Sequence, residues 1–122
     1  MSRYVDGFLL PIKKSGIEDY KKVSMDAGKI WKEYGALQYV ETLMEDSNKS
    51  EWSTSFAQYV KPAEDEVIVF SFIVYESRAH RDEVNKKVMA DPRMSPEAMK
   101  DKTMPFDMTK MAYNGFETIV DL

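Results

Sequence analysis

The chain has 122 residues, no cysteine and a formal net charge of −4, and neither half of it is basic. This length suits a single α+β domain over residues 1–122. The charge argues against a nucleic-acid partner, and the missing cysteines exclude disulfides and thiolate catalysis in this chain. No run approaches the ~18 apolar residues of a membrane span, and residues 1–8 lack the apolar core of a signal peptide, so we expect a cytoplasmic protein without membrane contact.

The first half of the chain predicts a strand, a helix and a second strand. Alternating residues indicate a strand over Tyr4–Ile12, and a capping-box pattern followed by an apolar stripe indicates a helix over Ser15–Tyr34. Gly28 lowers helix propensity by up to ~1 kcal/mol, which points to close packing at that position. Gly35 suits the left-handed conformation that ends many helices. Ala36–Glu45 alternates with mixed faces, which is typical of an edge strand.

The central strand is expected over Val67–Tyr75, because this short run is rich in Val, Ile and Phe. It is apolar on both faces, so both faces must be covered. Trp52–Val60 precedes it as an extended arm. Ser77 is placed to cap the next helix, which should run to Asp91, because the residue before Pro92 is driven out of helical conformation.

The last part of the chain predicts a short helix over Ser95–Asp101, a loop over Thr103–Asp107 that closes one end of the fold, and a strand over Lys110–Val120. Gly7 and Gly115 fall in the first and last strands, which should be neighbours. A β-bulge and room for a ligand are the two interpretations of this pair.

The order strand, helix, strand, strand, helix, strand is the split β-α-β pattern of the ferredoxin-like fold. Right-handed crossovers place the first and third strands in the centre of an antiparallel sheet. The helices cover one face, and the apolar residues on the open sheet face mark an interface. We therefore expect a homodimer in which two such faces meet. The alternative is a monomer whose arm, residues 52–60, folds over that face.

His80 is the one histidine, and its ordinary pKa lies near neutrality. It falls in the first turn of a predicted helix beside Arg78 and Arg81, where the helix N-terminus and two guanidinium groups favour an anion. His80 is therefore a candidate catalytic base or ligand contact, with both arginines as ligand-binding candidates. The alternative is that His80 bonds a backbone carbonyl while the arginines form ion pairs.

Asp6 is an acid among apolar neighbours, where burial would raise its pKa. It is the second catalytic candidate, as an acid or base that faces a cavity; the alternative is an ion pair with Arg78, Arg81 or Arg93. Four methionines in the last part of the chain could line a ligand site or fill the core. The remaining candidates for ligand contact are Tyr39, Tyr75, Arg93, Asp107 and Tyr113.

No familiar cofactor motif is present. The sequence has no P-loop, dinucleotide-binding turn or nucleophile elbow, and one histidine without cysteine makes a zinc site improbable. We expect no metal site and can name no cofactor. A heme with His80 as axial ligand rests on spacing alone.

Several motifs carry a resemblance over nearly the whole chain. YESRAHRD at 75–82 and KVMADPRM at 87–94 are supported by YVDGF at 4–8, GALQYVE at 35–41, MPFD at 104–107 and GFE at 115–117. Together they resemble the YbaA-like family of bacterial proteins of unknown function. The resemblance implies a dimeric α/β barrel, whose wider superfamily includes heme-degrading and cofactor-independent monooxygenases and muconolactone-isomerase-like enzymes. Asn114 departs from the pattern, which has a second glycine there.

Three functional hypotheses follow. The first is a small cytosolic homodimer that binds a small anionic or aromatic molecule between helices and sheet. The second is a cofactor-independent monooxygenase or isomerase with Asp6 or His80 as base. The third is a structural or partner-binding module without catalysis.

Overall fold

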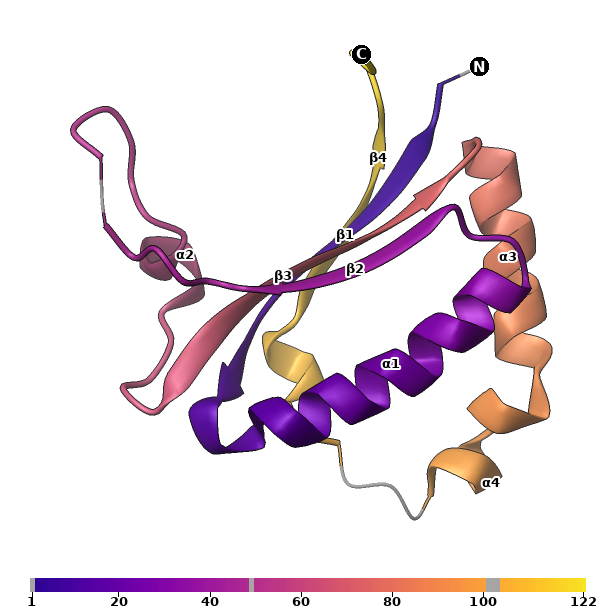
Figure 1. Ribbon diagram of the computed structural model, residues 1–122, viewed down its shortest axis with the longest axis horizontal. Coiled ribbons are helices and arrows are strands. Elements are labelled where there is room, and N and C mark those ends of the chain that lie inside the picture. Colours follow the sequence, from indigo (N-terminus) through magenta and orange to yellow (C-terminus); the bar gives the residue numbers. More distant parts are fainter. Residues whose placement is uncertain (1, 49, 101–103) are drawn as a thin grey trace.

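The computed structural model describes residues 2–48, 50–100 and 104–122, and Figure 1 shows its antiparallel sheet with two long helices on one side. The strands are β1 (Tyr4–Lys13), β2 (Gln38–Leu43), β3 (Glu66–Tyr75) and β4 (Ala112–Glu117), and the long helices are α1 (Ile17–Glu33) and α3 (Arg78–Ala90). The shorter helices are α2 (Ala57–Val60) and α4 (Pro96–Met99), with 3-10 turns η1 (Lys14–Gly16), η2 (Pro92–Met94) and η3 (Met108–Lys110).

The strand order is β2-β3-β1-β4, so the first and third strands are central, as the order of elements predicts. The ferredoxin-like α+β fold is therefore confirmed. The sheet does not close into a barrel within one chain, and a barrel would need a second sheet. The predicted end of the short helix at Asp101 and the predicted loop start at Thr103 lie outside the described residues.

Helix ends follow the sequence in part. The Ser77 hydroxyl caps α3 by accepting a hydrogen bond from the His80 amide at 3.1 Å, as predicted. The predicted capping box at Ser15 is wrong: Ser15 lies in the 3-10 turn η1, and Gly16 precedes α1 without a side-chain cap. Gly35 has the expected positive φ of 112° after α1, a conformation that glycine adopts without a Cβ clash.

The two glycines of the outer strand pair do not form a bulge. The register between β1 and β4 runs without interruption from Tyr4 opposite Glu117 to Leu9 opposite Ala112, so the bulge interpretation is wrong. Gly115 instead leaves room for the ring of Tyr4, because a Cβ there would collide with its hydroxyl. The glycine therefore serves cross-strand packing.

The main core lies between the sheet and the two long helices. Burial is nearly complete for the inward residues of the central strands and of α3, namely Leu10, Ile12, Val69, Ile73, Tyr75, Val84 and Val88. The opposite face of the sheet stays partly open, with Phe70 45% and Phe116 56% exposed. None of the helices in the described parts of the chain combines the length and apolar character that crossing a membrane requires.

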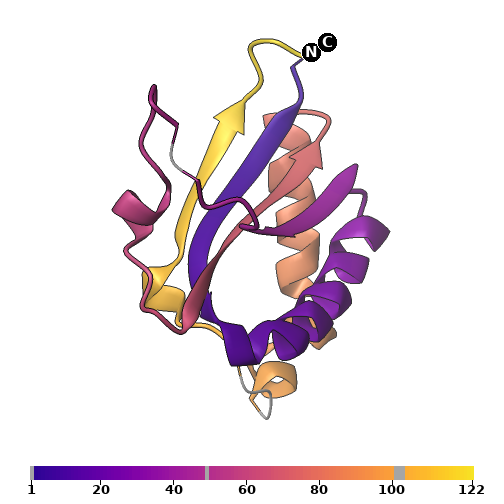
Figure 2. The same cartoon turned by 60° about the vertical axis from the view of Figure 1, so that its left-hand side comes forward.

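The arm before β3 contains the short helix α2 where the sequence suggested only extended chain. Figure 2 shows α2 on the side of the sheet that faces away from α1 and α3. Its neighbour Phe56 packs edge-on against Phe70 with ring centroids 6.3 Å apart, whereas Trp52 and Tyr59 are exposed. The arm thus covers only part of the open face.

Candidate functional site

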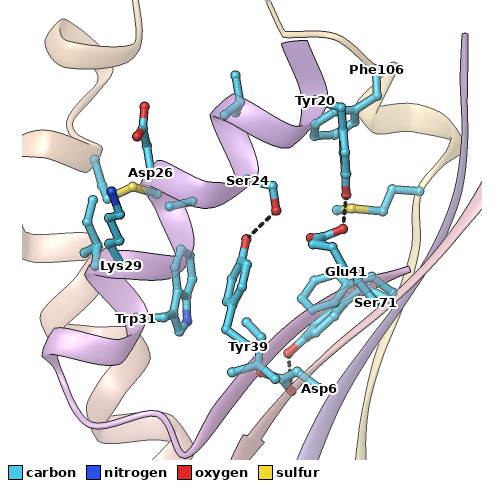
Figure 3. A pocket seen from close by; sticks show the side chains of 18 of the residues that line it. Asp6, Tyr20, Ser24, Asp26, Lys29, Trp31, Tyr39, Glu41, Ser71 and Phe106 are labelled. Carbon is cyan, nitrogen blue, oxygen red and sulfur yellow. Dashed lines mark hydrogen bonds between the residues drawn. The ribbon is translucent and has the colours of Figure 1, made fainter. Parts of the chain in front are cut away.

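A cavity of about 820 Å³ lies between α1, the sheet and the C-terminal segment (Figure 3). This volume is within the range of small-molecule sites. Aromatic side chains from every strand of the sheet and from α1 line the cavity. Six methionines also line it: four from the C-terminal segment, one from α3 and one from η2. Methionine side chains adapt to the shape of a ligand. The methionines concerned are Met89, Met94, Met99, Met104, Met108 and Met111.

The polar wall of this cavity arises from two simple spacings. Tyr20 and Ser24 are four residues apart on α1, which places both on one helix face. Tyr39 and Glu41 alternate on β2, which places both on the inner face of the sheet. The Tyr20 hydroxyl donates to Glu41 Oε2 at 2.6 Å, and the Ser24 and Tyr39 hydroxyls lie 3.2 Å apart (Figure 3). Two hydrogen-bonded pairs therefore join the helix to the edge strand.

Gly28 sets how closely α1 approaches that strand. A Cβ at this position would lie 2.6 Å from Cδ1 of Tyr39, closer than carbon atoms can approach. The close packing inferred from Gly28 is therefore confirmed, and the glycine holds the Tyr39 ring against the helix one turn beyond Ser24.

Glu41 is a carboxyl group without a cationic partner among the described residues. Burial raises the pKa of Glu41 above its ordinary value, and the hydrogen bond from Tyr20 opposes part of that rise. Burial and the adjacent carboxylate raise the pKa of Tyr20, and burial raises the pKa of Tyr39 to about 12. These hydroxyls therefore stay protonated near neutral pH, and that of Tyr20 donates to Glu41.

Asp6 lies at another part of the cavity wall and has a cationic partner. Its Oδ1 accepts hydrogen bonds from Arg81 Nη1 at 2.8 Å and from the Tyr113 hydroxyl at 2.9 Å. The Asp6 side chain is 2% exposed and that of Arg81 13%. Arg81 also stacks on the Tyr4 ring, 4.8 Å from its centroid. The structure thus contains the ion pair that one interpretation of Asp6 expected.

His80 is directed toward the backbone. Its Nδ1 accepts a hydrogen bond from the Glu76 amide at 3.0 Å, and its ring packs edge-on against Tyr75. His80 and Arg78 do not line the cavity, and Arg81 is bound to Asp6. The anion-binding cluster expected from these three residues therefore does not form around a common cavity. The backbone bond of His80 also differs from the predicted alternative, because the donor is an amide.

The other candidates divide between the cavity and its supports. Arg93 lines the cavity, but Asp91 and Glu33 hold its guanidinium at 2.7–2.9 Å through their closest contacts. Asp107 accepts from the Thr109 amide and hydroxyl and lies outside the lining. Among the predicted residues, the cavity brings together Asp6, Tyr39, Arg93 and Tyr113.

Tyr75 does not line the cavity but supports residues that do. It is fully buried, and its hydroxyl donates to Asn85 Oδ1 at 3.2 Å, an atom that also accepts from Trp31 Nε1 at 3.0 Å. Burial raises the pKa of Tyr75. Asn85 thereby fixes the Trp31 ring, which lines the cavity.

Sequence reasoning did not select Glu41, Tyr20 or Ser24 for the site. One signal was available: Glu41 shares a strand face with Tyr39, and an acid on an inward face is unusual. Among the described residues, no three His, Asp or Glu side chains gather in a way that could hold a metal ion.

Comparison with known proteins places the chain in a family. A family model described as a protein of unknown function (DUF1428) matches residues 3–108. The uncharacterised protein YbaA of Escherichia coli strain K12 is 40% identical over 119 residues, which cover 98% of each chain, and YbaA of Shigella flexneri matches equally. The chain belongs to this family. The resemblance read from its motifs is therefore confirmed.

Solved structures of low sequence identity share the fold. A dimeric ferredoxin-like protein from an uncultured marine organism aligns over the whole of both chains with TM-score 0.61 and 8% identity. A putative antibiotic biosynthesis monooxygenase from Nitrosomonas europaea aligns over 96% of this chain and 90% of its own with TM-score 0.55 and 9% identity. A NIPSNAP family protein from Agrobacterium tumefaciens covers 95% and 87% with TM-score 0.53 and 19% identity.

Proposed function

We propose that this protein binds a small aromatic molecule in the cavity between α1 and the sheet. The observation that carries the proposal is the cavity itself: about 820 Å³, walled by aromatic rings and methionines, with hydrogen-bonding groups concentrated near Asp6 and Glu41. Such a site takes a mainly apolar ligand and orients it through a few polar contacts. Of the two ligand classes expected from the sequence, the aromatic class has the better support, because both polar centres contain a carboxyl group.

The binding test uses N-phenyl-1-naphthylamine, an uncharged aromatic dye whose fluorescence rises in apolar surroundings. The wild-type protein should bind it saturably. Ala27→Trp fills the cavity from α1 and should abolish this binding, whereas Lys22→Trp places the same ring on the exposed side of the helix and should not. A folded Ala27→Trp protein that binds the dye like the wild type would contradict the assignment. Native mass spectrometry of freshly purified protein would detect a retained ligand as mass in excess of that of the polypeptide.

We also propose that two copies pair through the open sheet face. Phe70 on β3 and Phe116 on β4 are both exposed on this face, and the arm contacts it at Phe70. The marine structural relative is a dimeric ferredoxin-like protein, which supports the same arrangement here. A cytoplasmic location and the absence of a nucleic-acid partner stay predictions.

Native mass spectrometry also tests the pairing. The wild-type protein should be a dimer, and Phe70→Asp should shift it to monomer by placing a charge in the interface. Lys86→Gln changes the net charge equally on the exposed side of α3 and should leave the dimer intact. A monomeric wild-type protein would favour the alternative in which the arm alone covers the face.

A further inference from the structure

Glu41 lies in a wall shared by two cavities. The second cavity, of about 420 Å³, lies at the edge between α1 and β2 and is lined in part by Lys21 and Met25. Tyr20, Ser24, Tyr39 and Glu41 line both cavities. The Glu41 carboxyl group can therefore contact a ligand in one cavity while Tyr20 from α1 binds it by a hydrogen bond.

The two oxygens of Glu41 differ in their surroundings. Oε2 accepts the Tyr20 hydroxyl at 2.6 Å, whereas no hydrogen bond of regular geometry reaches Oε1 from the described residues. The Ser24 hydroxyl is the other polar group close to this carboxylate. Every buried side-chain oxygen among those residues has a partner, so Oε1 is accessible from a cavity. Asp6 differs from Glu41 in its partners, because the Arg81 guanidinium and the Tyr113 hydroxyl both bind its Oδ1.

We propose that Glu41 is a catalytic residue that moves a proton to and from carbon in an apolar carbonyl compound, with Tyr20 as the residue that positions it. The proposal rests on the proposed aromatic-binding function. Oε1 takes the proton from a carbon next to the carbonyl: the C–H bond breaks, an O–H bond forms on Glu41, and the electron pair moves into the carbonyl as an enolate. Return of the proton to another carbon of a conjugated substrate completes an isomerisation, with no oxidant or cofactor consumed.

The surroundings of Glu41 favour this role. A general base works best when its pKa approaches the working pH, and burial moves the pKa of Glu41 in that direction. The titratable groups that face it are Tyr20 and Lys21 from α1 and Tyr39 from its own strand. A substrate bound against the apolar lining of the larger cavity would displace water from Glu41, and a carboxylate with less solvation is more basic.

The test reaction is the elimination of 5-nitrobenzisoxazole, an aromatic compound that needs only a base. The base takes the C3 proton as the N–O bond breaks, and the cyanophenolate product is followed by its absorbance. The wild-type protein should accelerate the reaction, and Glu41→Gln should lower kcat/KM by about 100-fold, the lower end of the contribution of a positioned base. Glu45→Gln, at an exposed acid beyond the end of β2, should leave the rate unchanged.

Dye binding separates the two proposals. Suppose that Glu41→Gln binds N-phenyl-1-naphthylamine like the wild type and also catalyses the elimination at the wild-type rate. The catalytic role of Glu41 is then wrong, and the binding function stands. A wild-type protein that binds 5-nitrobenzisoxazole, shown by displacement of the dye, without accelerating its elimination also overturns the catalytic role. If the dye does not bind to the wild type, both proposals fail.

Two further measurements test Glu41 and Tyr20 separately, and the first of them needs no turnover. Carbon-13 NMR of the Glu41 carboxyl, assigned with Glu41→Gln, should show its titration move to higher pH when the dye displaces water; an unchanged titration overturns the proposal. Tyr20→Phe removes the donor that favours the ionised carboxylate, so the pH profile of elimination should also move to higher pH. A Tyr20→Phe profile that coincides with the wild-type profile contradicts the positioning role.

Discussion

Asp6 and Glu41 are two carboxyl groups that line one cavity but differ in their partners. Asp6 is bound by a guanidinium and a tyrosine hydroxyl that come from α3 and β4, whereas Glu41 is bound by one tyrosine hydroxyl from α1. A cation in direct contact favours the ionised form, and burial without a cation disfavours it. The same functional group therefore joins elements of the fold through an ion pair at one position and has no cationic partner among the described residues at the other.

The largest expected effect is that of Asp6→Asn on stability. This change leaves the Arg81 guanidinium, 13% exposed, without its buried partner. Breaking such a pair typically costs about 3–5 kcal/mol, and we expect the lower end because Arg81 keeps the exposed Asp82 at 2.8 Å. Urea unfolding at neutral pH should show this loss in the free energy of unfolding.

A second variant separates the loss of the pair from the loss of packing. Asp6→Asn combined with Arg81→Met removes both charges, so it should recover much of the stability lost in the single variant. If the double variant is as unstable as the sum of the single ones, the ion pair is not the feature that Asp6 stabilises.

Gly28→Ala tests the contact that holds α1 beside β2. The new methyl group would meet the Tyr39 ring, and overpacking of this kind costs about 1–3 kcal/mol, of which alanine's better helix propensity returns up to about 1. We expect a net loss near 1–2 kcal/mol in urea unfolding. Lys22→Ala, on the exposed side of α1, should change the stability by less than about 0.5 kcal/mol. A stabilised Gly28→Ala protein would mean that the helix can move away from Tyr39 freely.

The sequence identified the Asp6 side of the site better than the Glu41 side, for a physical reason. Asp6 interrupts an apolar strand, and this can be seen without knowing its neighbours. Glu41 becomes notable only when Tyr20 is opposite it, and that pairing depends on how far along the strand the helix is placed. Alternation and helical spacing predict which side chains share one face of a strand or helix. They do not predict where along β2 the helix α1 lies.

The fold was predictable because its main determinants are local. The apolar run of β3, the helix stripe that contains Gly28 and the order of elements together specify the strand order. Errors arose where two local conformations compete, as at Ser15, where a 3-10 turn replaced a capped helix start. The cavity itself could not be derived, because its volume depends on how side chains from distant segments fill the space.

Glu41→Gln should affect stability far less than Asp6→Asn, although both remove a carboxylate from the same cavity. Glutamine keeps the shape of the side chain and can still accept the Tyr20 hydroxyl, and no cation loses a partner. We expect the free energy of unfolding at pH 7 to stay within about 1 kcal/mol of the wild-type value. A loss comparable to that of Asp6→Asn would show that Glu41 has a structural role like that of Asp6.

The smallest expected effect is the pH dependence that Glu41 contributes. Its pKa in the folded state lies above the ordinary 4.5, so between these two values the folded protein holds more protons than the unfolded chain. Stability from this group therefore falls as pH rises through that interval, and is constant above it. Asp91 contributes in the opposite direction, because hydrogen bonds from Arg93 and Tyr34 lower its pKa, but Glu41→Gln retains that contribution. The difference in unfolding free energy, wild type minus Glu41→Gln, should thus decrease from pH 4 to pH 7; an increase would show that the folded state stabilises the ionised carboxylate.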